Sequence, residues 1–251
     1  MFSQFKKILL RFTQGEKTQS EVSLETPRAP RIKPTVIHNV HFHTENKPLG
    51  IAGIFNISVT GIGLLNVGLP EGMDIGSAFH GHLNIAGKSF TVHLRVAHIN
   101  GQIIGCAFEG DSHDVSKAIY DYFVAEISAM EVTEVNASLL KKDSRGDPRW
   151  FFGANNSEVY ITETDGRISY FHVTLLGNYF ESYADGEPKF GYIVGNDSNN
   201  NLKPDQAALI QYTNQMPQET LNLIGAFVRS MTALPQEHKA FILSVLSEAL
   251  D

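Results

Sequence analysis

Residues 90–96 read Phe90-Thr91-Val92-His93-Leu94-Arg95-Val96, with apolar and polar side chains in alternation. Successive side chains of a β-strand point to opposite faces, so this period of two predicts a strand with one buried face. Similar patterns recur over residues 35–108, where glycines punctuate the apolar runs and Asn100-Gly101 predicts a hairpin turn. Short strands joined by tight turns, without helices between them, predict an antiparallel sheet closed into a barrel.

A helix is expected after this sheet. Apolar residues recur every three or four positions from Ile119 to Met130, and Asp111 and Ser112 are suitable residues to cap its beginning. We expect this helix to lie across the barrel. Residues 132–149 then lose periodicity and gain a charged, turn-forming run at 141–148, which predicts a linker between domains.

The second half of the chain predicts a separate α+β domain. Four segments read as strands of an antiparallel meander, separated by turn-forming pairs: residues 158–162, 167–174, 179–183 and 189–194. After a polar loop at 196–203 the period becomes helical, and Pro204, Pro217 and Pro235 stand where helices can begin. The last helix has a broad apolar face, which we expect to pack against the meander rather than form a dimer seam.

The expected domain organisation therefore has four parts. They are an amphipathic helix and linker at 1–27, a β-barrel domain at 28–131, a linker at 132–149 and an α+β domain at 150–251. Within the first part, residues 1–12 place apolar side chains on one helical stripe beside three cations. So short a helix is expected to dock on protein rather than on a membrane.

Composition excludes several classes of protein. The formal net charge of −7 argues against a partner that is a nucleic-acid polymer, because phosphate binding needs many cations. The single cysteine, Cys106, lies in an apolar run and reads as a buried, inert thiol. The first residues lack the pattern of a signal peptide and no segment is long enough to span a bilayer, so a cytoplasmic location is expected.

Two stretches in the first half carry most of the functional information. Asn56-Ile57-Ser58-Val59-Thr60-Gly61 interrupts a strand pattern with polar groups, and residues two apart on a strand face the same side. About 25 residues earlier, residues 27–33 hold three cations and no anion, which favours a small phosphate ligand. Taken alone, the first stretch is also typical of a β-turn or bulge.

Together these stretches resemble the signature of the PilZ family of cyclic di-GMP receptors, an Arg-x-x-x-Arg segment followed by a strand and Asp/Asn-x-Ser-x-x-Gly. The second motif matches at Asn56, Ser58 and Gly61. Residues 28 to about 130 fit the family outline, which implies a six-stranded antiparallel barrel with a C-terminal helix. No comparable resemblance is identified for the second half.

The first motif departs from the family pattern. Arg31 takes the place of its second arginine, whereas Pro27 stands where the first is expected and Arg28 is one residue out of register. The resemblance implies a cyclic di-GMP site formed by Arg28, Arg31, Asn56, Ser58 and Gly61, with no further cofactor. Guanidinium groups suit this ligand because they bind phosphate bidentately and stack on rings.

The predicted function is a non-catalytic cyclic di-GMP receptor that passes the signal to a protein partner through protein–protein contacts. The alternative is a degenerate PilZ-like domain that acts as a ligand-independent interaction module. No catalytic signature is found in the sequence.

The sequence contains residues for two other kinds of site. The pairs His41/His43 and His80/His82 are each two residues apart and could bind a metal, but no cysteine pair or acidic cluster accompanies them, so we expect histidines on the wet face of the sheet and no metal site. Aromatic residues between Trp150 and Tyr183 could line a second pocket, and we expect them to form a core instead.

Overall fold

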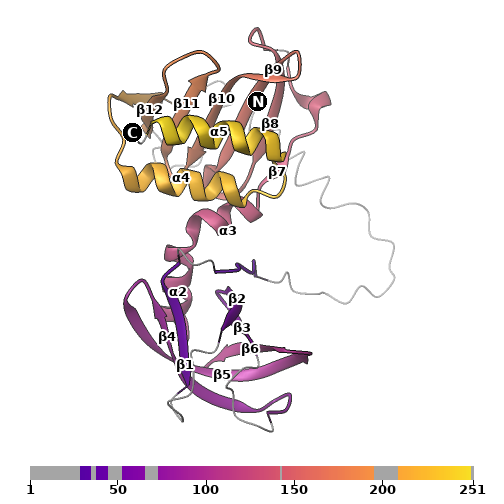
Figure 1. Ribbon diagram of the computed structural model, residues 1–251, viewed down its shortest axis with the longest axis vertical. Coiled ribbons are helices and arrows are strands. Elements are labelled where there is room, and N and C mark those ends of the chain that lie inside the picture. Colours follow the sequence, from indigo (N-terminus) through magenta and orange to yellow (C-terminus); the bar gives the residue numbers. More distant parts are fainter. Residues whose placement is uncertain are drawn as a thin grey trace. The chain divides into compact units, whose positions relative to one another are not determined.

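The computed structural model describes residues 29–34, 38–44, 53–65, 73–141, 143–194 and 209–249. The chain divides into two compact units between Ile127 and Ser128, near the predicted end of the first domain at residue 131. Figure 1 shows one antiparallel sheet in each unit. The helix predicted within residues 1–12, the linker up to residue 27, Arg28 and the loop at 196–203 lie outside the described residues.

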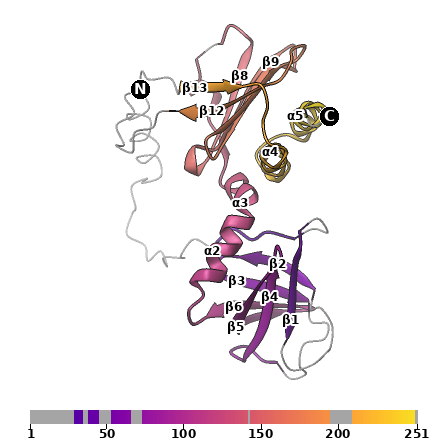
Figure 2. The same ribbon diagram turned by 90° about the vertical axis from the view of Figure 1, so that its left-hand side faces the viewer.

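The N-terminal unit is built on a curled six-stranded antiparallel sheet, drawn in indigo to magenta in Figures 1 and 2. Its strand order is β1-β4-β5-β6-β3-β2. Among the described strands β1 and β2 form the two edges, so the sheet is a half-barrel and the predicted full closure is not seen. The strands are β1 (Val40–Thr44), β2 (Ile54–Ser58), β3 (Gly61–Leu65), β4 (Ala78–Ile85), β5 (Lys88–Asn100) and β6 (Ile103–Glu109).

The apolar and polar residues that alternate over residues 90–96 are alternately buried and exposed along β5. Val92, Leu94 and Val96 are buried, whereas His93 and Arg95 are exposed. Buried side chains continue this core on the neighbouring strands. At one position on β4 a neighbouring side chain packs so close to the backbone that only glycine fits. A Cβ at Gly81 would overlap the Phe42 ring, so the missing side chain on β4 makes room for the aromatic core residue on β1.

The β5–β6 hairpin forms where Asn100-Gly101 predicted it, but its central residues are one position later. Asn100 pairs with Ile103, which leaves Gly101 and Gln102 in the turn. Gly101 has φ +58° and Gln102 has no positive φ, so the glycine takes the first central position, as in a type II′ turn.

The helix predicted after the sheet is interrupted. α2 spans His113–Tyr122 and α3 spans Val124–Met130, with a break at Phe123. Ser112 is the N-cap residue, but its side chain makes no capping hydrogen bond. The buried side chains of Ile119, Phe123 and Ile127 extend the core of the sheet, which is why their helical spacing was visible in the sequence despite the break.

The C-terminal unit contains a seven-stranded antiparallel meander in the order β13-β12-β11-β10-β9-β8-β7. The four predicted strands are confirmed as β9 to β12. The stretch 132–149, predicted as a linker, instead contributes β7, a 3₁₀ turn and the start of β8. The strands are β7 (Thr133–Glu134), β8 (Asp147–Phe152), β9 (Glu158–Thr164), β10 (Arg167–Leu175), β11 (Asn178–Tyr183), β12 (Lys189–Val194) and β13 (Leu209–Thr213).

Two helices, α4 (Gln218–Ser230) and α5 (Gln236–Glu248), cover one face of this second sheet (Figure 2). Pro217 and Pro235 are their N-cap residues. The Phe241 ring of α5 lies 6.0 Å from the Phe171 ring of β10, so the apolar face of the last helix packs on the meander as predicted. In the part of the chain that the structure describes, no helix has the length and apolar character needed to cross a membrane.

Candidate functional site

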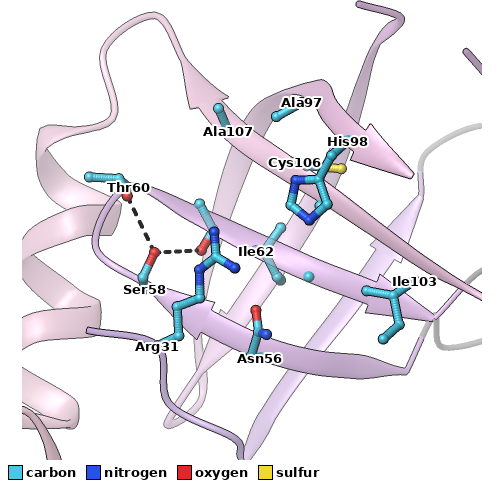
Figure 3. A pocket seen from close by; sticks show the side chains of 13 residues that line it. Arg31, Asn56, Ser58, Thr60, Ile62, Ala97, His98, Ile103, Cys106 and Ala107 are labelled. Carbon is cyan, nitrogen blue, oxygen red and sulfur yellow. Dashed lines mark hydrogen bonds between the residues drawn. The ribbon is translucent and has the colours of Figure 1, made fainter. Parts of the chain in front are cut away.

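A hollow of about 140 Å³ lies on the N-terminal sheet at the point where β2, β3, β5 and β6 run side by side (Figure 3). The side chains of Arg31, Asn56 and His98 are directed toward one another across it. None of the described lining residues carries a carboxylate, so the hollow suits an anionic ligand. It is lined by Arg31, Asn56, Ser58, Thr60, Gly61, Ile62, Gly63, Ala97, His98, Ile103, Gly105, Cys106 and Ala107.

Arg31 reaches this hollow because its neighbour Ile32 pairs with β2. The backbone N–H of Ile32 donates to the carbonyl of Ile57, and the N–H of Ile57 donates to the carbonyl of Ile32, each with an N–O distance of 2.8 Å. The Ile32 side chain is buried in the core of the sheet. Arg31 itself is exposed, and among the described residues no hydrogen bond or ion pair holds its guanidinium.

Asn56 enters the hollow from an irregular point of β2. The β2–β3 register shifts between Ile54 and Asn56, which marks a bulge, and bulges commonly redirect a side chain. The carboxamide lies over Gly63 on β3, where a Cβ would come within 2.7 Å of Asn56 Oδ1. No hydrogen bond joins this half-buried amide to another described group, so its donors and acceptor are available to a ligand.

Ser58 and Gly61 flank the two-residue turn that connects β2 to β3. The Ser58 hydroxyl donates to the carbonyl of Gly61 at 3.3 Å and lies 3.3 Å from the Thr60 hydroxyl. A Cβ at Gly61 would overlap the carbonyl of Cys106, so only glycine fits where β3 passes β6. The turn predicted as the structural explanation of this motif is therefore present, with Ser58 buried beside it.

His98 and Cys106 complete the hollow and were not predicted as site residues. His98 lies next to a bulge in β5 between Val96 and His98, and its ring covers Gly105. The sequence signal that could have indicated His98 is Gly105, because a glycine inside an apolar strand often marks a place where another group packs close to the backbone. Burial raises the pKa of the Cys106 thiol to about 11, so this lining group is neutral at ordinary pH.

The structure thus brings four of the five predicted ligand-binding residues to one hollow, although they come from two separated stretches of sequence. Arg31, Asn56, Ser58 and Gly61 all line it. The fifth, Arg28, lies outside the described residues.

The histidine pairs of the sequence are rearranged by the sheet. His43 stands opposite His82, and His80 stands opposite His93, so the close neighbours are across strands rather than along them. Over the described ranges, no three histidine, cysteine, aspartate or glutamate side chains gather closely enough to hold a metal ion between them.

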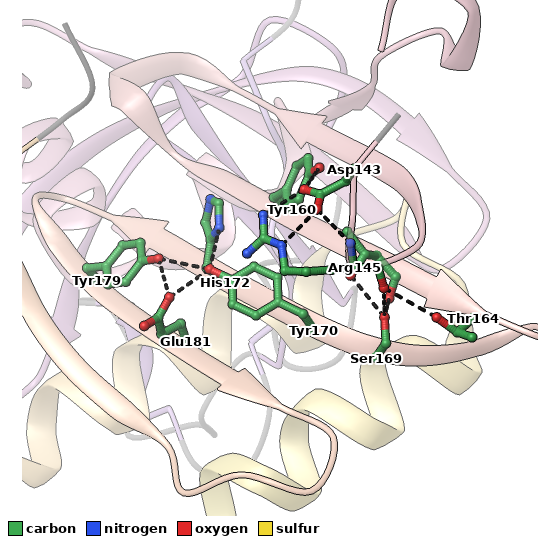
Figure 4. A network of polar contacts seen from close by, with 10 residues as sticks. Asp143, Arg145, Tyr160, Thr164, Ser169, Tyr170, His172, Tyr179 and Glu181 are labelled. Atoms are coloured by element: carbon green, nitrogen blue, oxygen red, sulfur yellow. Dashed lines mark hydrogen bonds and ion pairs between the residues drawn. The ribbon is translucent and has the colours of Figure 1, made fainter. Parts of the chain in front are cut away.

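Aromatic side chains of the C-terminal unit take part in a network of polar contacts (Figure 4). The Glu181 carboxylate accepts hydrogen bonds from three tyrosine hydroxyls, those of Tyr170 at 2.7 Å, Tyr179 at 2.8 Å and Tyr212 at 3.0 Å. Burial would raise the pKa of Glu181, but these hydroxyls together outweigh it and the pKa lies below its usual value. Glu181 is therefore an ionised, satisfied acceptor in the sheet.

Arg145 connects this network to a second carboxylate. Its guanidinium lies over the Tyr170 ring, 3.9 Å from the centroid, and donates to Asp143 from Nε at 2.9 Å and Nη2 at 2.7 Å. The Tyr160 hydroxyl donates to the same carboxylate at 2.8 Å. Arg145 holds the pKa of Asp143 well below its usual range, against a smaller opposing effect of burial. These mutually satisfied groups stabilise the sheet.

Three of the solved structures that are similar to this chain have the following coverage, identity and TM-scores. An uncharacterised Legionella protein, Lpg0364, is similar over 36% of this chain and 90% of its own, with 15% identity and a TM-score of 0.30. The K. pneumonia MrkH–c-di-GMP complex is similar over 41% and 53%, with 19% identity and a TM-score of 0.34. The PilZ domain of CeSA from a cellulose-synthesizing bacterium is similar over 39% and 99%, with 13% identity and a TM-score of 0.28.

This chain thus spans about half the length of MrkH. No family model and no curated protein matches the sequence.

Proposed function

We propose that this chain is a non-catalytic receptor for cyclic di-GMP that passes the signal on through protein–protein contacts. The observation that carries the proposal is the convergence of Arg31 and Asn56 on one hollow without a carboxylate in its described lining. Both side chains lack a hydrogen-bond partner among the described residues, so neither has an interaction to give up when a ligand arrives.

The available groups match the chemistry of a cyclic purine dinucleotide. A guanidinium binds phosphate through two parallel N–H donors and can stack on a purine ring. A carboxamide offers both donors and an acceptor to the edge of guanine. The exposed His98 ring adds a flat surface across the hollow from Arg31. We propose Arg31 as the phosphate or ring contact and Asn56 as a base contact, with Arg28 as a further phosphate contact.

Signal transfer would begin at the segment 29–34. This segment is bonded to β2 through the Ile32–Ile57 bridge, next to the hollow. A ligand that binds Arg31 favours the docked arrangement of this segment over the undocked one, and a shift between two arrangements is what a protein partner can detect.

Titration calorimetry of the whole chain with cyclic di-GMP tests the proposal. Arg31→Ala and Asn56→Ala are each expected to weaken binding about 10–100-fold, because each removes hydrogen bonds worth about 1.5–3 kcal/mol. Arg167→Ala and Asn84→Ala are the matched controls, since both residues lie away from the hollow, and they should bind as tightly as the wild type. Equal affinity in all five proteins would refute the assigned site.

One observation favours the alternative of a ligand-independent interaction module. The Ser58 hydroxyl is already used within the β2–β3 turn and the residue is only 6% exposed, which a purely structural motif explains. Capture of a partner protein with and without the dinucleotide distinguishes the two functions. Absence of binding heat together with capture that the dinucleotide does not change would establish the module.

A further inference from the structure

Five histidines share the outer face of three neighbouring strands of the N-terminal sheet. In each strand the core residues point to the opposite side, as Phe42 does on β1, Leu83 on β4 and Val92 on β5. The alternation therefore turns every intervening histidine outward. They are His41, His43, His80, His82 and His93.

One cross-strand pair in this group brings two ring nitrogens together. His80 on β4 is the register partner of His93 on β5, and their Nδ1 atoms lie 2.8 Å apart. The rings are nearly perpendicular, with an interplanar angle of 84° and a centroid separation of 4.6 Å. Both side chains are exposed, so an ion from solvent can reach them.

This separation matches that of two nitrogens bound to one metal ion. Imidazole nitrogens lie about 2.0–2.1 Å from Cu²⁺, Ni²⁺ or Zn²⁺, so two ligands at a right angle are about 2.8–3.0 Å apart, and two tetrahedral ligands about 3.3 Å. An ion that replaces the proton between the two Nδ1 atoms lies off the line that joins them, so both exposed rings must turn to direct their lone pairs at it. The pair therefore has the spacing of cis ligands.

The groups around His80 and His93 determine which further ligands a metal ion bound there can have. Glu109 on β6 is opposite His93, but its carboxylate is paired with Arg95, and Arg95 also donates to the carbonyl of Gly76 at 3.0 Å. Because the described residues supply no third ligand within reach, water must complete the coordination. A site made of two imidazoles and water favours late first-row ions, because these ions bind imidazole well. It disfavours Mg²⁺ and Ca²⁺, which prefer oxygen ligands.

We propose that His80 and His93 form a two-imidazole surface site for a late first-row divalent ion, with Cu²⁺ bound most tightly. The site does not use any residue of the hollow, so it stands independently of the proposed receptor function. Two imidazoles with water give modest affinity, and Cu²⁺ binds ahead of Ni²⁺ and Zn²⁺ in the usual order of stability.

The test is titration of the untagged full chain with Cu²⁺, followed by calorimetry and by electron paramagnetic resonance. We expect one ion per chain with hyperfine coupling to two imidazole nitrogens. His80→Gln and His93→Gln should each weaken binding by about tenfold or more, since a lone imidazole loses the chelate. His113→Gln is the matched control, because His113 is exposed on α2, and it should bind like the wild type.

Binding that is absent, or equally strong in all four proteins, would overturn the proposal. Both substituted side chains are exposed, and circular dichroism of each variant checks that the fold is kept. As a second readout, Cu²⁺ broadens nuclear magnetic resonance signals of nearby groups. In the wild type it should broaden the His80 and His93 ring signals before that of His113, and the reverse order would also refute the site.

Discussion

Ile32 and Ile57 exchange two backbone hydrogen bonds, each with an N–O distance of 2.8 Å, across 25 residues of sequence. This bridge brings the basic segment to the polar motif, because Arg31 precedes Ile32 and Asn56 precedes Ile57. Both neighbours project into the same hollow. The position of the proposed ligand contacts thus depends on one short pairing at the outer edge of β2.

The first prediction concerns the side chain that anchors this bridge. Ile32 is 5% exposed, so Ile32→Ala should lower the free energy of unfolding by about 2–4 kcal/mol, whereas Ile32→Val should cost about 1 kcal/mol. Urea denaturation of both variants measures the difference. Ile75→Ala is the control, because Ile75 is 68% exposed and its truncation should change stability by less than about 0.5 kcal/mol. If Ile32→Ala were as harmless as Ile75→Ala, the segment would not be docked.

The second prediction concerns Cys106, the only cysteine of the chain. The residue is 5% exposed, and burial raises the pKa of its thiol from 9.0 to about 11, so the reactive thiolate is about a hundredfold scarcer in the folded protein. Labelling with a chromogenic disulfide at about pH 8 should be at least about a hundredfold slower in the native chain than in urea. Cyclic di-GMP should slow it further because Cys106 lines the hollow. Equal rates in native and unfolded chains would contradict the buried position.

Alternation in the sequence predicts a strand whose two faces differ in burial. It is clear in β5, whose inner residues are buried and whose outer ones are exposed, and at the start of β9. β10 and β11 bury residues on both faces and were predicted from the turn-forming pairs between them. β8 begins Asp147-Pro148-Arg149 and buries only Phe151 completely, so its sequence resembles a loop. β7 has two exposed residues and is defined only by its pairing with β8.

Some residues of the site could be predicted from local sequence, whereas others are positioned by contacts between distant segments. The spacing of Asn56, Ser58 and Gly61 is local, since a strand and its turn fix which side each residue faces. The bridge that positions Arg31 is a contact between distant segments, and only the family resemblance indicated it. His98 enters the hollow through a bulge, which reverses the alternation after Val96 and has no distinct signal in one sequence.

The third prediction uses the low pKa of Asp143. The Arg145 side chain lowers this pKa well below the ordinary value of 3.8, so ionised Asp143 stabilises the fold fully above about pH 4. That contribution is lost as the pH falls toward the folded-state pKa. Asp143→Asn should therefore lower the free energy of unfolding by about 1–2 kcal/mol at neutral pH, since the pair is only partly buried, with side chains 15% and 34% exposed.

The pH dependence separates this charge effect from a packing defect. Urea denaturation between about pH 7 and pH 2.5 should show the gap between wild type and Asp143→Asn closing below about pH 4. Asp147→Asn is the control, because Asp147 is exposed, and it should follow the wild type throughout. A gap of constant size at every pH would mean that the ionised carboxylate is not what stabilises the sheet.

The last prediction compares two glycines of β3 that face the hollow. A Cβ at Gly63 would lie 2.7 Å from Asn56 Oδ1, the end of a side chain that can rotate away, whereas a Cβ at Gly61 would overlap the fixed carbonyl of Cys106. Gly61→Ala should therefore cost about 1–3 kcal/mol of stability. Gly63→Ala should keep the fold but displace the amide and weaken cyclic di-GMP binding about tenfold.

Thermal unfolding and calorimetry of both variants test this contrast, with Gly87→Ala as the reference. Gly87 has φ +80° and an added Cβ would meet open space, so alanine there adds backbone strain of about 1 kcal/mol without touching the hollow. Its ligand affinity should equal that of the wild type. If Gly63→Ala bound the dinucleotide as tightly as Gly87→Ala did, Asn56 would not be a base contact, because the alanine and the carboxamide cannot occupy the same space.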